Sequence, residues 1–114
     1  MKKFVLLVLV LITGLTVFSQ GIEFQKGRYA EVLEMAKKQN KLVFIDIYTS
    51  WCGPCKHMAD NVFPQAKVGE YYNAHFLNLQ LDAEKSEDGK MVAKTFGVSA
   101  YPTFLFVNGD GELV

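Results

Sequence analysis

Two cysteines, Cys52 and Cys55, are the only cysteines in this chain of 114 residues, and they lie three positions apart. They follow a strongly apolar run, residues 42–48, and precede a segment whose pattern predicts a helix. A thiol in the first turn of a helix faces the positive end of the helix dipole, which favours the thiolate. The second thiol lies one helical turn further and can close a disulfide with the first. The pattern therefore predicts thiol–disulfide exchange, with Cys52 as the nucleophile and Cys55 as the resolving thiol.

A zinc site is the main alternative for the same two thiols. Zinc needs four ligands, and only His57 and His75 are available to complete the set. His57 lies two residues after Cys55 on the same predicted helix and so points away, and His75 falls near the start of a predicted strand. Covalent haem attachment needs a histidine directly after the second cysteine, where this chain has Lys56. We therefore expect no metal, and no cofactor other than the redox-active disulfide.

The composition is that of an ordinary globular domain, with half of the residues hydrophobic and 21% charged. A chain of 114 residues is expected to form one domain. Twelve basic and twelve acidic residues balance one another, so the charge gives no indication of a nucleic-acid partner.

The first nineteen residues have the pattern of a cleaved signal peptide. Two lysines near the start precede an unbroken apolar run over residues 4–12, and residues 17–19 offer a cleavage site with small or modest side chains. An uncleaved membrane anchor is the alternative, but a span needs about 20 apolar residues, and polar residues interrupt this run early. We therefore predict a signal peptide over 1–19, a mature domain over 20–114, and a periplasmic or secreted protein.

Export bears on how the cysteine pair is interpreted, because disulfides persist outside the cytoplasm. A disulfide that closes a loop of four residues is expected to stabilise a protein by only about 2 kcal/mol. A pair this close is therefore a poor structural cross-link, which favours a redox role.

Hydrophobic periodicity predicts alternating helices and strands. A helical pattern of apolar residues covers 27–39 and stops at Asn40, and the apolar run over 42–48 predicts a strand buried on both faces. Further predicted elements are a helix over 52–73 that Pro64 kinks or breaks, a strand over 76–81, a loop and helix start over 82–89, a helix over 90–96 capped at Gly97, a strand over 103–107, a hairpin turn at 108–111 and the start of a strand at 112–114. This order predicts an α/β fold with a mixed central sheet, parallel in its core and antiparallel at one edge.

The chain ends just as the last predicted strand begins. A strand of three residues with nothing covering it would leave an apolar sheet face in contact with water. We therefore expect a truncated sequence in which the last strand and a final helix are incomplete.

Three motifs resemble the thioredoxin superfamily, in the same order along the chain: residues 44–48 (FIDIY), 51–56 (WCGPCK) and 96–103 (FGVSAYPT). The resemblance covers most of the predicted mature chain. Cys-Gly-Pro-Cys is the pattern of thioredoxin itself, whereas residues 58–72 are more similar to an exported thioredoxin-like group that includes the periplasmic domains of transmembrane thiol reductases. The resemblance implies a thioredoxin-like fold, with helices flanking the sheet.

Asp46 is an acidic residue within an apolar strand, where burial is expected to raise its pKa. The alternative is a carboxylate that turns to solvent at a strand edge. By resemblance, Asp46 matches the family's buried aspartate, which accepts a proton from the resolving cysteine. Cys55 is also expected to be more buried than Cys52.

The resemblance further implies a substrate groove around the cysteine pair. Pro102 resembles the family's cis-proline, with an ordinary trans-proline as the alternative, and the main chain at Tyr101 is expected to pair with a substrate peptide in β fashion. Trp51 either contacts substrate or fills core space. Gly53 and Pro54 set the turn between the cysteines and the redox behaviour of the pair.

Two positions depart from the family pattern. Thioredoxin usually has a lysine near the buried aspartate, in the strand after the long helix, and the equivalent position here falls on or near Asn78. Thioredoxin also has a small aliphatic residue before its cis-proline, where this chain has Tyr101.

Together these patterns predict an exported thiol–disulfide oxidoreductase that reduces or isomerises protein disulfides. The Gly-Pro pair between the cysteines resembles the reducing end of the family, since no histidine stands there to stabilise the Cys52 thiolate. A reductase in an oxidising compartment needs an electron donor, and we expect a membrane thiol reductase, with disulfide-containing proteins as substrates and a monomeric enzyme. The alternative is a non-catalytic binding or electron-relay module of a longer polypeptide.

Overall fold

The protein folds as a mixed sheet with helices on both sides, and the computed structural model describes Gly14 and residues 20–114. Apart from Gly14, the predicted signal peptide lies outside the described residues. The elements follow in the order α1 (Tyr29–Gln39), β1 (Leu42–Tyr48), α2 (Gly53–His57), the π-helix η1 (Met58–Val62), α3 (Ala66–His75), β2 (Phe76–Asp82), α4 (Glu87–Thr95) and β3 (Thr103–Val107). This arrangement confirms the predicted fold class. Within the described range, no helix is both long and apolar enough to cross a membrane.

The central strand of the sheet is β1, which lies between β2 and β3. It runs parallel to β2, with Leu42 opposite Phe76, and antiparallel to β3, with Val43 opposite Val107. The sheet therefore has the predicted parallel pair and the predicted antiparallel edge.

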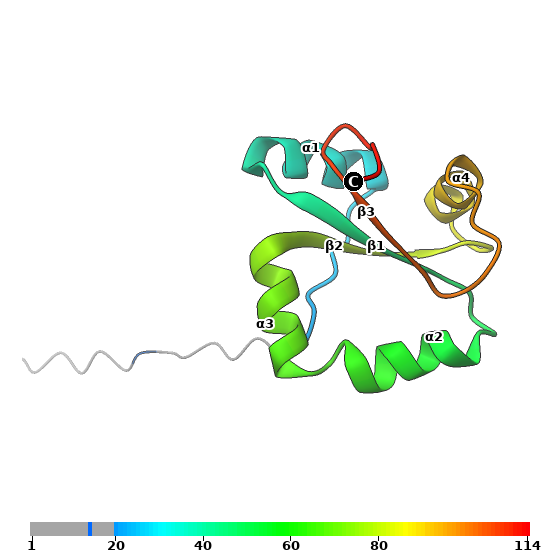
Figure 1. The fold of residues 1–114 in the computed structure, drawn as a ribbon, viewed down its shortest axis with the longest axis horizontal. Coiled ribbons are helices and arrows are strands. Elements are labelled where there is room, and N and C mark those ends of the chain that lie inside the picture. Colours follow the sequence, from blue (N-terminus) through cyan, green and yellow to red (C-terminus); the bar gives the residue numbers. More distant parts are fainter. Residues whose placement is uncertain (1–13, 15–19) are drawn as a thin grey trace, which may run out of the picture.

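One face of β1 forms part of the main hydrophobic core. Val43, Ile45 and Ile47 are fully buried there, together with apolar residues of α1, α4, β2 and β3. Figure 1 shows α1 on one side of the sheet and α2 with α3 on the other. The opposite face of β1 carries Phe44 and Asp46, which are also buried. The strand is thus buried on both faces, as its apolar run predicts.

An aromatic cluster packs against the face of the sheet that is turned toward α3. Phe44 is buried, and its ring lies 4.9–6.3 Å, between ring centroids, from the rings of Phe63, Tyr72, Phe104 and Phe106. Aromatic pairs at these separations attract one another beyond the effect of burial alone. The cluster therefore fixes α3 and the end of η1 on the sheet, and with them the helical segment that carries the cysteines.

The predicted helix over 52–73 consists of three helical segments. α2 continues directly into η1, where the Phe63 N–H donates to the Met58 carbonyl at 2.9 Å. Pro64 has no N–H with which to continue the helix, and α3 starts after an extended Gln65. The predicted break at Pro64 is confirmed. The end of the helix is corrected to His75, because the chain stays helical up to the first residue of β2.

α1 begins at Tyr29, two residues after the predicted start, and is tied to α4 at that end. Asp88 accepts hydrogen bonds from the Tyr29 N–H at 2.9 Å and from the Arg28 guanidinium at 3.0 and 3.1 Å. The extended backbone of Arg28 keeps that residue outside the helix. At the other end, Asn40 adopts a left-handed conformation with φ of 52°, so the predicted stop is confirmed.

α4 begins at Glu87, within the segment 82–89 for which a helix start is predicted. Ser86 caps it by accepting a hydrogen bond from the Gly89 N–H at 2.7 Å. Serine is a preferred residue at this position, because its oxygen satisfies an N–H that has no partner within the helix. Beyond the helix, Gly97 has a φ of +64°, as its predicted capping position requires.

The turn over 108–111 is formed as predicted, and the Gly111 N–H donates to the Asn108 carbonyl at 3.0 Å. After the turn, Leu113 makes one antiparallel bridge to Val107. Residues 112–114 therefore run back along β3 through a single bridge instead of a full strand.

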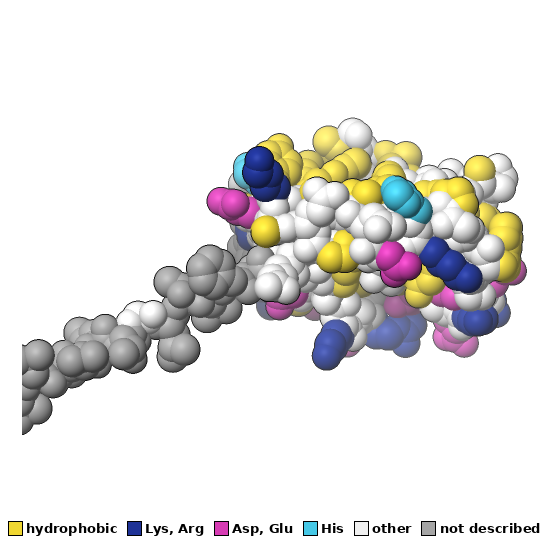
Figure 2. All heavy atoms as spheres, turned by 90° about the horizontal axis from the view of Figure 1, so that it is seen from below, with side chains coloured by type: hydrophobic (Ala, Val, Ile, Leu, Met, Phe, Trp, Pro, Cys, Tyr) yellow, Lys and Arg dark blue, Asp and Glu magenta, His cyan; other side chains and the backbone are white. Residues whose placement is uncertain are grey.

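Figure 2 shows the face of the molecule that carries α2 and α3. Basic and acidic side chains are interspersed on this face among apolar and polar surface.

Gly69 of α3 lies directly against the segment that precedes α1. A Cβ at position 69 would lie 2.1 Å from the Gly21 carbonyl oxygen, which the Asn73 amide also contacts at 3.0 Å. The Gly69→Ala variant is therefore expected to lower the free energy of unfolding by about 1–3 kcal/mol in a urea titration. Lys67→Ala, at an exposed position of the same helix, is the control and should change it by less than about 0.5 kcal/mol. Equal stability of the two variants would contradict this packing.

Candidate active site

The Cys52–Cys55 pair forms a disulfide at the start of α2, four residues after the end of β1. Cys52 is the N-cap residue of α2 and Cys55 lies in its first turn, with the two Cα atoms 5.2 Å apart. The Cys52 Sγ accepts a hydrogen bond from the Cys55 N–H at 3.1 Å. After reduction, this N–H and the helix dipole favour a negative charge on the Cys52 sulfur.

The two cysteines are buried to a similar degree, with Cys52 3% exposed and Cys55 6% exposed. The expectation that Cys55 is the more buried is therefore wrong for the oxidised protein.

Gly53 and Pro54 form the turn between the cysteines. Pro54 stands in the first turn of α2, where its missing N–H costs no helical hydrogen bond. A Cβ on Gly53 would meet no heavy atom within 4 Å. This side of the turn is therefore open to solvent.

Asp46 lies in β1 on the face turned toward α2. It is 3% exposed, and burial raises its pKa from 3.8 to about 6. The Gln80 Nε2 donates a hydrogen bond to the Asp46 Oδ2 at 3.3 Å, which lowers the pKa and offsets part of the burial effect. The other oxygen, Oδ1, is buried without a hydrogen-bond partner in the described part of the chain. The carboxyl group is therefore turned inward, with one oxygen free to accept a proton.

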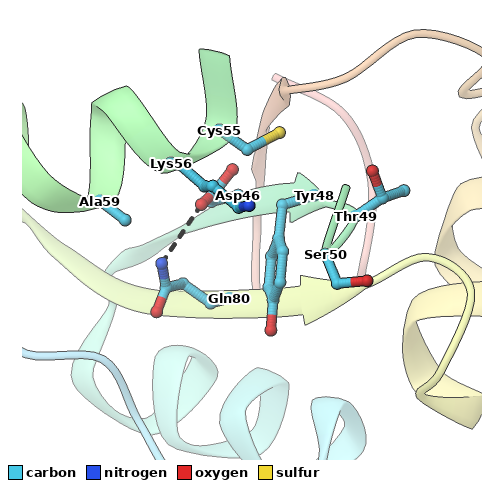
Figure 3. Close-up of a pocket in the computed structure, with 8 residues that line it drawn as sticks. All are labelled: Asp46, Tyr48, Thr49, Ser50, Cys55, Lys56, Ala59 and Gln80. Atoms are coloured by element: carbon cyan, nitrogen blue, oxygen red, sulfur yellow. Dashed lines mark hydrogen bonds between the residues drawn. The ribbon is translucent and has the colours of Figure 1, made fainter. Parts of the chain in front are cut away.

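Asp46 and Cys55 line the same pocket, which has a volume of about 260 Å³. Figure 3 shows the Asp46 carboxyl group between Gln80 and the helix that carries Cys55. Lys56 follows Cys55 on that helix. One water molecule takes up about 30 Å³ in the liquid. The pocket therefore has room for water that can carry a proton between Cys55 and Asp46.

Gln80 is the residue of β2 that contacts Asp46, whereas sequence reasoning pointed to Asn78. The strand register places Gln80 opposite Asp46 and Asn78 opposite Phe44. The Asn78 amide instead donates to the Tyr72 carbonyl at 3.4 Å. Asp46 and Gln80 are each the fifth residue of neighbouring parallel strands, a pairing that follows only once the register of the two strands is known.

The Gln80→Leu variant is expected to raise the pKa of Asp46 above about 6, because it removes a donor that stabilises the charged carboxylate. Gln80→Lys should lower the same pKa, since a nearby cation favours the charged form. NMR titration of the Asp46 carboxyl group measures both shifts. Gln39→Leu, at the exposed end of α1, is the control. No shift in Gln80→Leu would mean that this hydrogen bond does not act on Asp46.

Trp51 and Tyr101 form an aromatic rim next to the disulfide. Trp51 is 67% exposed, so it does not fill the core. Its ring meets the Tyr101 ring edge to face, with the centroids 6.1 Å apart and an angle of 88° between the planes. The Trp51 indole N–H donates a hydrogen bond to Glu84, in the loop after β2. Sequence reasoning missed Glu84, because an acidic residue in a polar loop carries no sign of such a contact.

The peptide bond between Tyr101 and Pro102 is cis. This is the form that the family resemblance implied for Pro102. Tyr101 is half-buried and packs against the main core, so its ring joins the core to the rim.

The two histidines contact residues other than the cysteines and lie apart from each other. His57 is exposed and its Nδ1 lies 3.3 Å from the Asn61 amide nitrogen, whereas His75 stacks on Tyr71 with the ring centroids 4.2 Å apart. Figure 2 shows the histidine side chains at separate places on one face. Across residues 20–114, no three side chains of the types that bind metals come together.

The chain matches the family model of the thioredoxin-like domain over residues 29–114. Thioredoxin H2-1 of Oryza sativa subsp. japonica is 39% identical over 88 residues, which cover 77% of this chain and 59% of the relative. Thioredoxin H4 of Arabidopsis thaliana is 40% identical over 82 residues, which cover 72% and 63%. The chain thus belongs to the thioredoxin-like family, and it spans about 60% of the length of these two relatives.

Two solved structures share the fold. The solution structure of a candidate disulphide-isomerase from Bacteroides thetaiotaomicron is 46% identical, with a TM-score of 0.72, and the match covers 83% of this chain and 78% of that one. A DsbH oxidoreductase is 19% identical, with a TM-score of 0.73, and the match covers 86% and 73%. The second similarity is one of fold alone.

Proposed function

We propose that this protein is a thiol–disulfide oxidoreductase whose redox couple is Cys52–Cys55. The observation that carries the proposal is a disulfide at the start of a helix that shares a pocket with a buried carboxyl group. Membership of the thioredoxin-like family and the thioredoxin relatives support it.

The reaction begins with the reduced protein, in which the Cys52 thiolate attacks one sulfur of a substrate disulfide. A bond forms between the Cys52 Sγ and that sulfur, the substrate S–S bond breaks, and the other substrate sulfur leaves as a thiolate. Cys55 then gives its proton to Asp46 through the shared pocket and attacks the Cys52 Sγ. The intramolecular disulfide is restored and the second substrate sulfur leaves, so two electrons pass from the protein to the substrate.

The proposed direction is reduction or isomerisation of protein disulfides. The Gly53-Pro54 pair between the cysteines supports it, as does the 46% identity to a candidate disulphide-isomerase. Repeated reduction requires a source of electrons, and we propose a membrane thiol reductase as the donor. The donor would attack the Cys52–Cys55 disulfide by the same exchange chemistry and return it to the dithiol.

We further propose that the domain acts outside the cytoplasm, after removal of residues 1–19. The charged start, the apolar run and the small or modest side chains of Val17 and Ser19, three residues and one residue before the predicted cleavage point, support export. Amino-terminal sequencing of the protein made in its own cells should begin at Gln20, in the periplasmic or secreted fraction. A chain that keeps residues 1–19 and stays with the cytoplasmic fraction would contradict export.

Reduction of insulin disulfides by the purified protein tests the proposed activity. We expect turnover with dithiothreitol as the electron source, because a general reductase accepts unrelated protein disulfides. A module that only relays electrons within a longer polypeptide should barely reduce insulin. This assay therefore separates the proposed enzyme from its main alternative.

A further inference from the structure

Glu84 accepts a hydrogen bond from the indole N–H of Trp51, next to the disulfide. We propose that Glu84 is a positioning residue that holds the Trp51 ring in place beside the cysteines and thereby strengthens the binding of protein disulfides. The inference rests on the proposed function for its effect on substrates. Its structural half, the anchoring of the ring, can be tested without any substrate.

The loop that carries Glu84 is itself held firmly. The Asp82 Oδ1 accepts hydrogen bonds from the N–H groups of Glu84 and Lys85, each at 2.9 Å. The Ala83 N–H donates to the Tyr48 carbonyl at the end of β1, also at 2.9 Å. Glu84 is therefore displayed from a turn that is fixed to two neighbouring strands, on the same side as the segment that follows β1.

Trp51 depends on such an anchor because little else holds its ring. The side chain is 67% exposed, and Tyr101 is the other ring that it meets in the described structure. An exposed side chain that must be ordered on binding costs affinity, whereas one already held in place does not. The Glu84 contact on one edge and the Tyr101 ring on the other prepare a fixed aromatic surface beside Cys52.

Trp51 is the only tryptophan of the chain, so the tryptophan fluorescence comes from this ring alone. In the oxidised protein, Glu84→Ala should add a fast component to the anisotropy decay of Trp51, because the indole is released. Glu84→Gln should keep the slow decay, since its amide oxygen can still accept from the indole. Glu34→Ala is the matched control, because Glu34 is an exposed glutamate of α1. A slow decay unchanged in Glu84→Ala would overturn the anchoring.

The effect on substrates is measured as KM for insulin reduction. Glu84→Ala is expected to raise KM about two- to tenfold, the range that corresponds to ordering one side chain on binding. The value of kcat should stay close to that of the wild type. In Glu84→Gln, KM should return most of the way to the wild-type value. With Trp51→Phe already in place, Glu84→Ala should raise KM no further, because the phenyl ring has no N–H for Glu84 to hold. Additive effects of the two substitutions would overturn the proposal.

The two kinds of failure are distinguishable. If the unmodified protein does not reduce insulin, the proposed function fails, and the role of Glu84 in substrate binding fails with it. The anisotropy decay still shows in that case whether Glu84 holds Trp51. If insulin is reduced and Glu84→Ala changes neither KM nor the decay, the proposed function stands and this inference is wrong.

Discussion

The Cys55→Ser variant is expected to accumulate a mixed disulfide between Cys52 and its substrate, because the thiol that releases the substrate is missing. The lifetime of the mixed disulfide should lengthen from seconds toward hours, the range of uncatalysed exchange, or about a thousandfold. Non-reducing gels and mass spectrometry of the variant after reaction with oxidised insulin measure this product. The same variant used in cell extracts would identify the natural substrates.

Cys52→Ser is the matched control for the trap. Its rate of insulin reduction should fall below about a thousandth of the wild-type rate, because a serine hydroxyl is neither ionised at neutral pH nor able to form a disulfide. Both cysteines are almost fully buried in the oxidised protein, so burial does not decide which of them attacks first. The Cys55 N–H donates a hydrogen bond to the Cys52 sulfur, which favours a thiolate there. This contact identifies Cys52 as the thiol that attacks first. Trapping through Cys55 in the Cys52→Ser variant would reverse the assigned roles.

The Asp46→Asn variant should be more stable than the wild type at pH 7.5, by up to about 3 kcal/mol, from the rise in pKa from 3.8 to about 6 at 1.36 kcal/mol per unit. The physical reason is that the folded protein buries a charged carboxylate with one oxygen unpartnered. Urea unfolding of both proteins at pH 7.5 measures the difference. Asp60→Asn, at an exposed carboxyl group of η1, is the control and should change stability little.

The dependence of this effect on pH follows from the same shift. Below about pH 4, Asp46 is protonated in both the folded and the unfolded protein, and the variant has no advantage from this source. As the pH rises from about 4 to 6, the unfolded chain ionises first, so the wild type loses stability. Above about pH 6, the wild type has lost all of the stability that depends on this group, and the difference from the variant stays constant. A gain in Asp46→Asn that does not depend on pH would contradict this origin.

The same substitution should slow the reaction, because asparagine does not accept a proton from Cys55. A general base contributes about 10²- to 10⁴-fold to such a step, and we expect the release of the mixed disulfide at pH 7 to slow by about 10²-fold. Rapid-mixing measurement of this step separates it from the first attack by Cys52, which should keep its rate. Gain of stability together with loss of rate in one variant would show that Asp46 is kept for its chemistry.

Much of the fold could be predicted from local patterns. The strand over 42–48 is apolar at every position except Asp46, so its burial on both faces follows directly, and Pro64 breaks the helix where its missing N–H requires. The start of α4 could be placed only within 82–89, because its apolar residues begin after the Ser86 cap. The π-helical turn of η1 has no sequence signal of its own, since it differs from an α-helix only in a local change of hydrogen-bond partner, from the fourth to the fifth preceding residue.

The residues of the site also fall into those that the sequence indicates and those that it does not. Cys52, Cys55 and Asp46 stand out because a thiol pair and a lone acid in an apolar strand are rare in ordinary sequences. Gln80 and Glu84 were missed, because each acts through a contact that only the register of β1 with β2 and the loop after β2 create. Residue type predicts which groups can react, whereas the contacts that orient them depend on how the strands align.

The most direct measurement is the equilibrium of the purified protein with glutathione, with the thiols counted by mass after alkylation. We expect one two-electron transition, in which Cys52 and Cys55 change together within a single chain, at a potential nearer the −270 mV of thioredoxin than the −120 mV of a strong oxidant. Independent glutathione adducts on the two cysteines, with no intramolecular disulfide, would contradict the claim that they form one redox couple.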